Sequence, residues 1–240
     1  MAKYFDEKKW LKALKKPDWY LELVDDFKKI MQQRRQVDDK TSFEIKKELY
    51  QFFEKQLVSN NIILGASGPD WDKERKPIDT IVIHHSKNQP GLALTILNAA
   101  HLVRLYAYYY ANPTYEGEKY IKGQSIYSGH FKNTKQVFYG YHWFIRMNGE
   151  VKRLLEDKNI GWHAGNWEVN CRSIGICLDN NFTNSSPSDL AISSVVKIIK
   201  ENYPQIKAKD ILGHREVNPK TECPGNTFLT DWKKKITQNF

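Results

Sequence analysis

The chain has 240 residues, enough for one large domain or for one domain with an additional segment. Hydrophobic residues make up 40% and charged residues 27%, which is typical of a folded globular protein and excludes wholesale disorder. No stretch approaches the roughly 18 consecutive apolar residues of a membrane-spanning helix. Three cysteines, an odd and low number, argue against a disulfide framework.

The formal net charge of +9 is unevenly distributed along the chain. Residues 1–79 contribute +2, with 17 basic and 15 acidic side chains, and the rest contribute +7. A basic excess favours an anionic partner, such as nucleic acid, an acidic glycan or an anionic wall polymer. Charge alone does not choose among them.

The first sixty residues have the apolar spacing of helices. We predict a short helix over residues 4–15, and then a longer one whose apolar face comprises Tyr20, Leu23, Val24, Phe27, Ile30 and Met31. Thr41 and Glu44 have capping-box spacing, which predicts that a further helix begins there and ends near Leu57. The Gly- and Pro-containing loop 65–69 is the best domain boundary.

After this loop, β-branched apolar runs alternate with helical patterns. Asn148–Gly149 predicts a hairpin turn, and Ser186–Pro187 predicts the start of a helix. Strands are predicted at 78–83, 137–145, 151–155 and 173–178, and helices at 92–110 and 186–202. The predicted fold is therefore α/β, with a helical extension over 1–68 and a second domain over 69–240 that contains a long polar insertion around 112–136.

Histidine and cysteine occur at three places in this second part. His84 and His85 end the first predicted strand, His214 follows a glycine, and Cys223 lies nine residues later. Zinc binds His nitrogen and Cys thiolate, and catalytic zinc sites use three protein ligands. Such a site would activate water for amide hydrolysis. The alternative is a set of hydrogen-bonded structural histidines and an inert buried thiol.

Five ordered motifs together resemble the zinc-dependent N-acetylmuramoyl-L-alanine amidases, close to the phage lysozyme-type amidases and the peptidoglycan recognition proteins. They are IVIHHS at 81–86, GYHWFI at 140–145, SIGICL at 173–178, GHREV at 213–217 and TECPG at 221–225. The resemblance covers about residues 78–230. It implies a mixed central β-sheet flanked by helices, with zinc in a groove. It also implies cleavage of the amide between N-acetylmuramic acid and L-alanine.

The resemblance implies a role for several individual residues. His84, His214 and Cys223 match the zinc ligands, and Tyr141 matches the catalytic tyrosine. His85 is expected to pack or hydrogen-bond elsewhere, because adjacent strand residues face opposite sides. By the same argument His142 is expected to be structural. Related amidases have a glutamate at the position of Cys177, and this cysteine is expected to be a buried apolar residue.

A second group of residues is expected to surround the scissile amide. Thr221 aligns with a position that is lysine in the phage branch, and its hydroxyl would bind the oxyanion. His163 would hydrogen-bond the substrate or assist proton transfer, while Trp162, Asn166 and Trp167 would bind the substrate. The alternative for this segment is a loop that folds over its own aromatic side chains.

Two departures from the family pattern stand out. His214 and Cys223 are separated by one more residue than in many recognition proteins. The insertion around 112–136 would form either an extra wall of the substrate groove or a loop packed on its own tyrosines.

The predicted function is zinc-dependent hydrolysis of peptidoglycan or muropeptides. The alternative is a recognition module that binds peptidoglycan without cutting it. No nucleic-acid-binding motif is present, and membrane insertion is not expected. Because the N-terminal sequence lacks the apolar run of a signal peptide, a cytoplasmic enzyme or a released lysis enzyme is expected.

Overall fold

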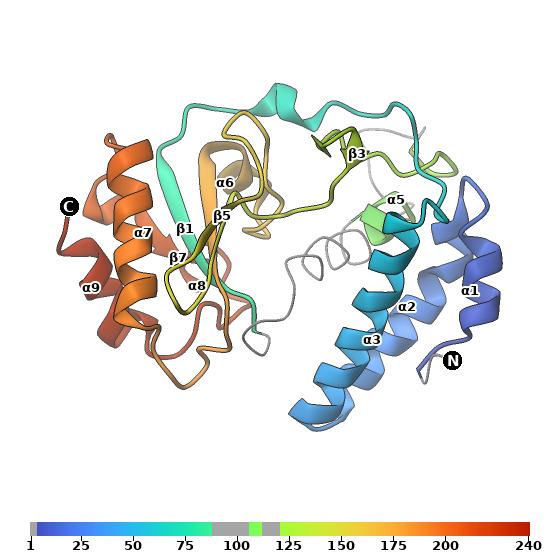
Figure 1. Cartoon of the computed structure of the whole chain (residues 1–240), viewed down its shortest axis with the longest axis horizontal. Helices are drawn as coiled ribbons and strands as arrows, with labels where there is room; N and C mark the ends of the chain where they lie inside the picture. The colour runs from blue at the N-terminus through green and yellow to red at the C-terminus, as the bar shows by residue number, and fades with distance from the viewer. Residues whose placement is uncertain (1–3, 88–105, 112–120) are drawn as a thin grey trace. The chain divides into compact units, whose positions relative to one another are not determined.

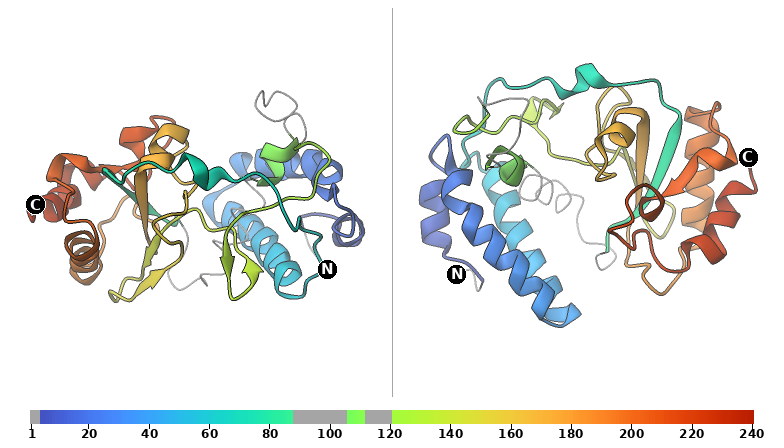
Figure 2. Two further views of the ribbon diagram at one scale, coloured as in Figure 1. Left: turned by 90° about the horizontal axis from the view of Figure 1, so that it is seen from above. Right: turned by 180° about the vertical axis from the view of Figure 1, so that it is seen from behind.

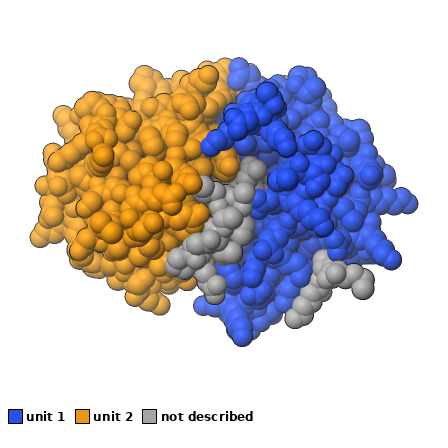
Figure 3. All heavy atoms as spheres, in the orientation of Figure 1, with its two compact units in different colours: residues 1–70, 93–138 blue, residues 71–92, 139–240 orange. Residues whose placement is uncertain are grey.

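The computed structural model describes all residues except 1–3, 88–105 and 112–120. The chain divides into two compact units, coloured separately in Figure 3. Unit 1 comprises Met1–Asp70 and Ala93–Phe138, and unit 2 comprises Trp71–Leu92 and Tyr139–Phe240. The grouping therefore assigns residues 93–138 to the same unit as the N-terminal helices, whereas the sequence interpretation kept them in the second domain. The domain boundaries at 68 and 69 remain a prediction.

The N-terminal part of unit 1 that the structure describes contains three helices, of which α2 and α3 lie side by side as a helical hairpin (Figure 2). Their bounds are α1 Glu7–Ala13, α2 Trp19–Gln36 and α3 Asp39–Val58. The predicted start of α3 at Thr41 is wrong by a few residues. The Asp38 carboxylate accepts a hydrogen bond from the Thr41 amide at 2.9 Å, so Asp38 is the N-cap and the helix begins at Asp39.

The core of unit 1 is aromatic. Fully buried side chains include Trp10, Trp19, Tyr20 and Phe53, and rings from all three helices meet edge to face. The Tyr20 hydroxyl accepts from the Gly123 amide and donates to a neighbouring carbonyl, so later residues pack onto α2. These later elements are α5 Tyr108–Ala111, β2 Phe131–Lys132 and β3 Lys135–Gln136. Most of the helix predicted at 92–110 lies outside the described residues.

Unit 2 contains a five-stranded sheet in the order β5-β4-β6-β1-β7. The strands are β1 Thr80–His85, β4 Trp143–Ile145, β5 Val151–Arg153, β6 Ser173–Leu178 and β7 Ile211–Gly213, and the short helix η1 Trp71–Glu74 precedes them. Strand β1 pairs in parallel with β6 and β7, whereas β5 is antiparallel to β4. The sheet is therefore mixed, as predicted.

Helices cover both faces of this sheet (Figure 1). Their bounds are α6 Trp167–Arg172, α7 Asp189–Asn202, α8 His214–Val217 and α9 Lys233–Thr237, with the short helices η3 Ala208–Asp210 and η4 Phe228–Trp232. Helices α7 and α9 bury an isoleucine-rich core against one face, which includes Ile81 and Ile83 of β1. On the other face Val82 packs against Ala164 and Val169. The predicted α/β class, a mixed central sheet flanked by helices, is confirmed.

Several predicted boundaries differ from the structure. Helix α7 begins at Asp189, not near residue 186, because Ser188 is its N-cap and accepts from the Ala191 amide at 3.2 Å. The strand predicted at 137–145 shortens to β4, and that predicted at 151–155 to β5. The hairpin at Asn148–Gly149 is confirmed. All three cysteines are free thiols. In the part of the chain that the structure describes, no helix is both long and apolar enough to cross a membrane.

Candidate metal centre

The site begins at the carboxyl end of β1, which pairs with β6 on one side and with β7 on the other. His84 is the fifth residue of this strand, is fully buried, and pairs in register with Cys177 of β6. Because side chains alternate along a strand, His84 shares the face of Val82, on which α6 packs. His85 faces the α7 side, where its Nδ1 accepts the Phe182 amide at 3.0 Å. The expectation that His85 packs away from the site is therefore confirmed.

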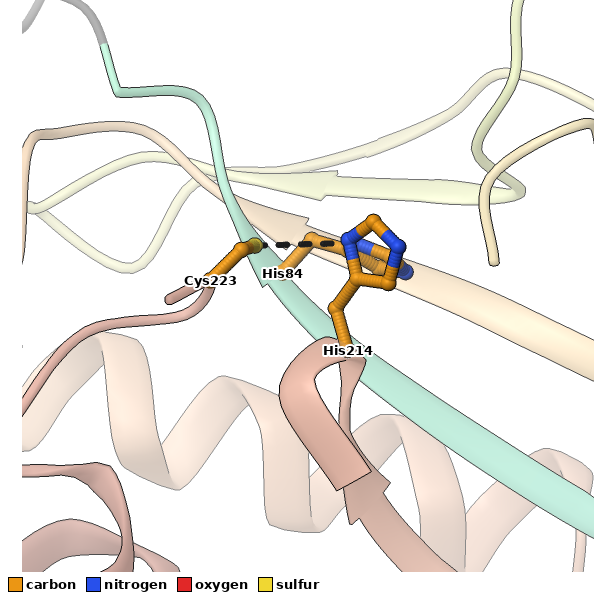
Figure 4. Close-up of side chains that lie close together, drawn as sticks. All are labelled: His84, His214 and Cys223. Atoms are coloured by element: carbon orange, nitrogen blue, oxygen red, sulfur yellow. Dashed lines mark hydrogen bonds between the residues drawn. The ribbon is translucent and has the colours of Figure 1, made fainter. Parts of the chain in front are cut away.

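Two further candidate ligands come from the chain that follows β7. His214 is the first residue of α8, directly after the strand that pairs with β1, and Cys223 lies in the loop after α8. The Arg215 amide donates to the Cys223 carbonyl at 2.7 Å, which closes this loop. Figure 4 shows His84, His214 and Cys223 converging. One ligand-type atom from each lies within 4.8 Å of the other two.

Hydrogen bonds determine which ring nitrogens remain for a metal ion. His214 Nε2 lies 3.0 Å from the Ala164 carbonyl oxygen, which can only accept, so Nε2 carries the proton. His84 Nε2 lies 3.0 Å from His163 Nδ1. The Nδ1 atom of His84 is 3.7 Å from Cys223 Sγ, on the side of the cluster. Both imidazoles thus have Nε2 engaged outside the cluster, and Nδ1 of His84 lies toward Cys223 Sγ.

The cysteine completes a donor set that suits zinc. The His85 amide lies 3.4 Å from Cys223 Sγ and donates to it, which favours the thiolate. Burial raises the pKa of the Cys223 thiol to about 12 in the protein alone. A bound cation acts in the opposite direction and deprotonates a coordinating thiol. Two imidazoles and one thiolate, held by other hydrogen bonds, therefore fit a zinc ion.

Tyr141 lies beside this cluster, two residues before β4. Its ring centroid is 4.9 Å from that of His84 and 6.4 Å from that of His163. Its side chain is partly exposed, in contrast to both histidines. His142 is fully buried, accepts from the Gly175 amide and bonds the Asn159 carbonyl, so its expected structural role is confirmed.

The structure also places the residues expected around the substrate. His163 is only 5% exposed, and its Nε2 lies 3.3 Å from Ser173 Oγ, so both ring nitrogens are engaged within the protein. Thr221 is partly exposed, and its oxygen accepts the Cys223 amide at 3.2 Å. Asn166 is the N-cap of α6.

Trp162 and Trp167 form a small aromatic group with Trp71. Their ring centroids are 5.6 Å apart, and both remain partly exposed. Each also packs edge to face on Trp71. Trp162 and Trp167 thus pack on each other and on Trp71 of η1, while part of each of the two rings stays exposed.

Two residues that hydrogen-bond the segment around His163 were not singled out in the sequence. The Asn170 side chain accepts from the amides of both His163 and Ala164, at 3.1 and 2.8 Å, and Ser173 bonds the His163 ring. An asparagine inside a helix can indicate such a role, because its side chain tends to hydrogen-bond backbone groups outside the helical pattern. The sequence pattern does not predict a helix at 167–172, and Asn170 therefore does not stand out in it.

Comparison with known proteins identifies the family of this chain. The model of the N-acetylmuramoyl-L-alanine amidase family matches residues 74–226, nearly two thirds of the chain. The chain belongs to this amidase family. The match includes the segments that carry His84, Tyr141, His214 and Cys223, which agrees with the resemblance noted in the sequence.

Individual relatives of this chain include both enzymes and recognition proteins. The chain is 25% identical over 117 residues to 1,6-anhydro-N-acetylmuramyl-L-alanine amidase AmpD of Haemophilus influenzae, covering 45% of this chain and 62% of that protein. It is 30% identical over 105 residues to the endolysin of Escherichia phage T7, covering 40% and 64%. It is 32% identical over 105 residues to peptidoglycan-recognition protein SC1a of Drosophila melanogaster, covering 42% and 55%. The aligned stretch thus spans less than two thirds of each of these curated relatives.

Among solved structures, the chain is similar to the endolysin amidase LysCS from Clostridium intestinale. The sequence identity is 23%, the TM-score is 0.48, and the match covers 72% of this chain and 90% of that one.

Proposed function

We propose that this family member is a zinc-dependent amidase that cleaves the bond between N-acetylmuramic acid and L-alanine in peptidoglycan or muropeptides. The observation that carries the proposal is the convergence of His84, His214 and Cys223 beside the partly exposed Tyr141. His84, His214 and Cys223 would hold the ion, which supplies a Lewis acid that polarises a carbonyl and activates water.

The chain's own residues would then handle protons and charge. Hydrolysis adds a water oxygen to the lactyl carbonyl carbon, breaks the C–N bond and delivers a proton to the alanine nitrogen. Tyr141 is the hydroxyl beside the cluster that could relay this proton or donate to the carbonyl oxygen. Thr221 accepts the Cys223 amide through its oxygen, which leaves its hydroxyl hydrogen to donate to the oxyanion.

Substrate binding would use the partly exposed aromatic group. The accessible ring surface of Trp162 and Trp167 suits stacking on a sugar. Asn166 uses its side-chain oxygen to cap α6, so its amide nitrogen is the group left for a substrate. His163 is buried with both ring nitrogens engaged, and we therefore assign it no substrate contact.

The test is to incubate the zinc-loaded protein with intact peptidoglycan and, separately, with soluble muropeptides, and to identify the products by mass. We expect free stem peptide that begins with L-alanine. Cleavage of intact wall points to a lysis enzyme, and cleavage of fragments alone points to a cytoplasmic role. The Cys223→Ala variant should lose activity, whereas Cys171→Ala, which removes a buried thiol outside the cluster, should keep it.

A folded, zinc-loaded protein that releases no product contradicts the proposal. If the same sample sediments with insoluble peptidoglycan, the recognition-module interpretation takes its place. The presence of Cys223 favours catalysis, because the proposed ligand set is then complete.

A further inference from the structure

Two consecutive residues contact both candidate histidine ligands on the side away from the cluster. His163 Nδ1 lies 3.0 Å from His84 Nε2, and the Ala164 carbonyl oxygen lies 3.0 Å from His214 Nε2. His84 belongs to β1 and His214 to α8, which are 130 residues apart in the chain. One short stretch of backbone therefore reaches both imidazoles.

We propose that the His163–Ala164 segment orients both histidines of the metal centre, and that Asn170 is the positioning residue that holds this segment. The part that concerns zinc rests on the proposed function. For His84 to offer Nδ1 to a metal, its Nε2 must carry the proton and donate to His163 Nδ1. His163 Nε2 then carries its own proton and donates to Ser173 Oγ at 3.3 Å.

Asn170 fixes the backbone of the segment. Its side-chain oxygen accepts two amides, from His163 at 3.1 Å and from Ala164 at 2.8 Å, and Asn170 is only 6% exposed. Its own carbonyl accepts a hydrogen bond from the Arg75 guanidinium at 3.1 Å. The support thus runs from α6 through one side chain to the two residues that contact the histidines.

The packing around the His163 ring leaves little room for another arrangement. A Cβ added at Gly175 of β6 would lie 2.7 Å from the ring, so only glycine lets the imidazole lie against the strand. On the other side of the segment Gly165 has φ +63°, a conformation that glycine adopts without strain. The segment is therefore held by the buried hydrogen bonds to the Asn170 side chain and by the close packing of the His163 ring on Gly175.

A purely structural role would look different. His142 is also fully buried with both ring nitrogens engaged, but its partners are a carbonyl and an amide that lie outside the metal cluster. His163 instead contacts a candidate ligand directly. Loss of such outer partners typically lowers metal affinity about 10–100-fold.

The first experiment measures zinc affinity by competition with a chelator at fixed pH. Asn170→Leu removes the acceptor of both amides and should weaken zinc binding about 10–100-fold. Asn170→Asp keeps an acceptor oxygen in the same place and should restore most of the affinity. The matched control is Asn159→Leu, which removes a side-chain hydrogen bond to Asp72 at 2.7 Å in the same unit and should leave zinc affinity unchanged.

A second pair tests the ring itself. His163→Leu removes the acceptor for His84 and should weaken zinc binding, whereas His163→Asn keeps an acceptor near the Nδ1 position and should weaken it less. Equal zinc affinity in wild type, Asn170→Leu and His163→Leu would overturn the proposal. Equal loss in Asn170→Leu and Asn159→Leu would assign the effect to general destabilisation and would overturn it as well.

The closing experiment reads the tautomers directly by NMR of protein labelled with 15N-histidine. Zinc-loaded protein should show His84 and His214 protonated at Nε2 and bound through Nδ1. Metal-free protein should already show His214 protonated at Nε2, because the Ala164 carbonyl can only accept. Coordination through Nε2 of either residue, or an Nδ1–H tautomer of His214 without metal, would overturn the proposal. A protein that binds no zinc but shows the expected His214 tautomer would contradict the proposed function and leave the orienting segment standing.

Discussion

Unit 1 packs its core from indole, phenol and phenyl rings, whereas unit 2 packs isoleucine and valine around a sheet and also buries four histidines. These histidines are His84, His85, His142 and His163, none more than 5% exposed. Burying a polar ring is unfavourable unless hydrogen bonds compensate, and in unit 2 each of the four has a partner. Among the described residues, the one group able to hold a metal ion also lies in unit 2. Unit 1 also buries one histidine, His130, but this residue is not part of a group that could hold a metal ion. The comparison indicates that what distinguishes unit 2 is the convergence of its histidines with a cysteine, and not the burial of a polar ring as such.

Removing the metal should have the largest effect and should separate the two units. A chelator is expected to reduce amidase activity to background, and added zinc should restore it. At zinc about 1,000-fold above its dissociation constant, binding should stabilise the folded state by about 4 kcal/mol. Hydrogen exchange read by mass spectrometry should show this protection in peptides from β1 and from residues 211–225. Equal protection in the α1–α3 peptides would contradict the expectation that zinc stabilises unit 2 alone.

The reverse test acts on unit 1. Trp10 is fully buried and packs on Phe27, Phe52 and Phe53, so Trp10→Ala should lower the free energy of unfolding by about 3–5 kcal/mol. Zinc affinity should change by no more than about twofold. Urea unfolding and chelator competition measure the two quantities. The exposed Lys8→Ala on the same helix serves as the control and should alter neither.

Within unit 2, the hydroxyl groups of Tyr141 and Tyr203 should differ in their effects on kcat and on stability. Tyr141→Phe should lower kcat about 100- to 1,000-fold, with zinc affinity retained, because only a group beside the reacting atoms is removed. Tyr203 bonds Trp143 and Asp157 through its hydroxyl in the interior. Tyr203→Phe should therefore lower stability but not kcat. Steady-state kinetics gives kcat and thermal unfolding gives the stability of both variants. If kcat falls only in proportion to the loss of stability in the two variants, the role of Tyr141 is contradicted.

The smallest expected effect is a pH dependence of stability. Burial, with the nearby positive charge of Arg75, lowers the pKa of His142 to about 3, against about 6.5 in the unfolded chain. As the pH falls below 6.5 the unfolded state takes up a proton that the folded state does not, so stability is lost. The contribution of His142 should be about 2–3 kcal/mol between pH 6.5 and 4.5.

Urea unfolding at several pH values measures this slope. His142→Asn should make the slope shallower by about one proton in this range. If the free energy of unfolding of His142→Asn depends on pH as steeply as that of the wild type, other groups are responsible for the pH dependence.

The sequence predicted the parts of the site that ordered motifs mark. His84, His214 and Cys223 do lie together, because the two histidines lie at the ends of neighbouring parallel strands. The opposite orientation of His84 and His85 followed from strand alternation alone. Neither inference needed tertiary detail.

Other parts depended on contacts between distant segments. Strand β7 has three residues and no repeating apolar pattern, so its pairing with β1 shows only in the fold. Asp38 and Ser188 cap their helices although equally good capping residues lie two or three positions away. The proposed role of Asn170 depends on its hydrogen bonds to two amides of the preceding loop. Helix propensity does not predict such contacts.

The two histidines of β1 have a consequence for how reliably the sheet assembles. All six residues of this strand are buried, so its apolar residues do not distinguish one side of the sheet from the other. The histidines do: His84 has His163 and Cys223 on its side, and His85 has the Phe182 amide on the other. A shift of the strand by one residue would turn both imidazoles to the opposite faces of the sheet, so that at most one of them could take the place of the other and the second would lose its partners. The adjacent histidines thus make a misaligned pairing of β1 less stable than the native one, even before a metal ion binds.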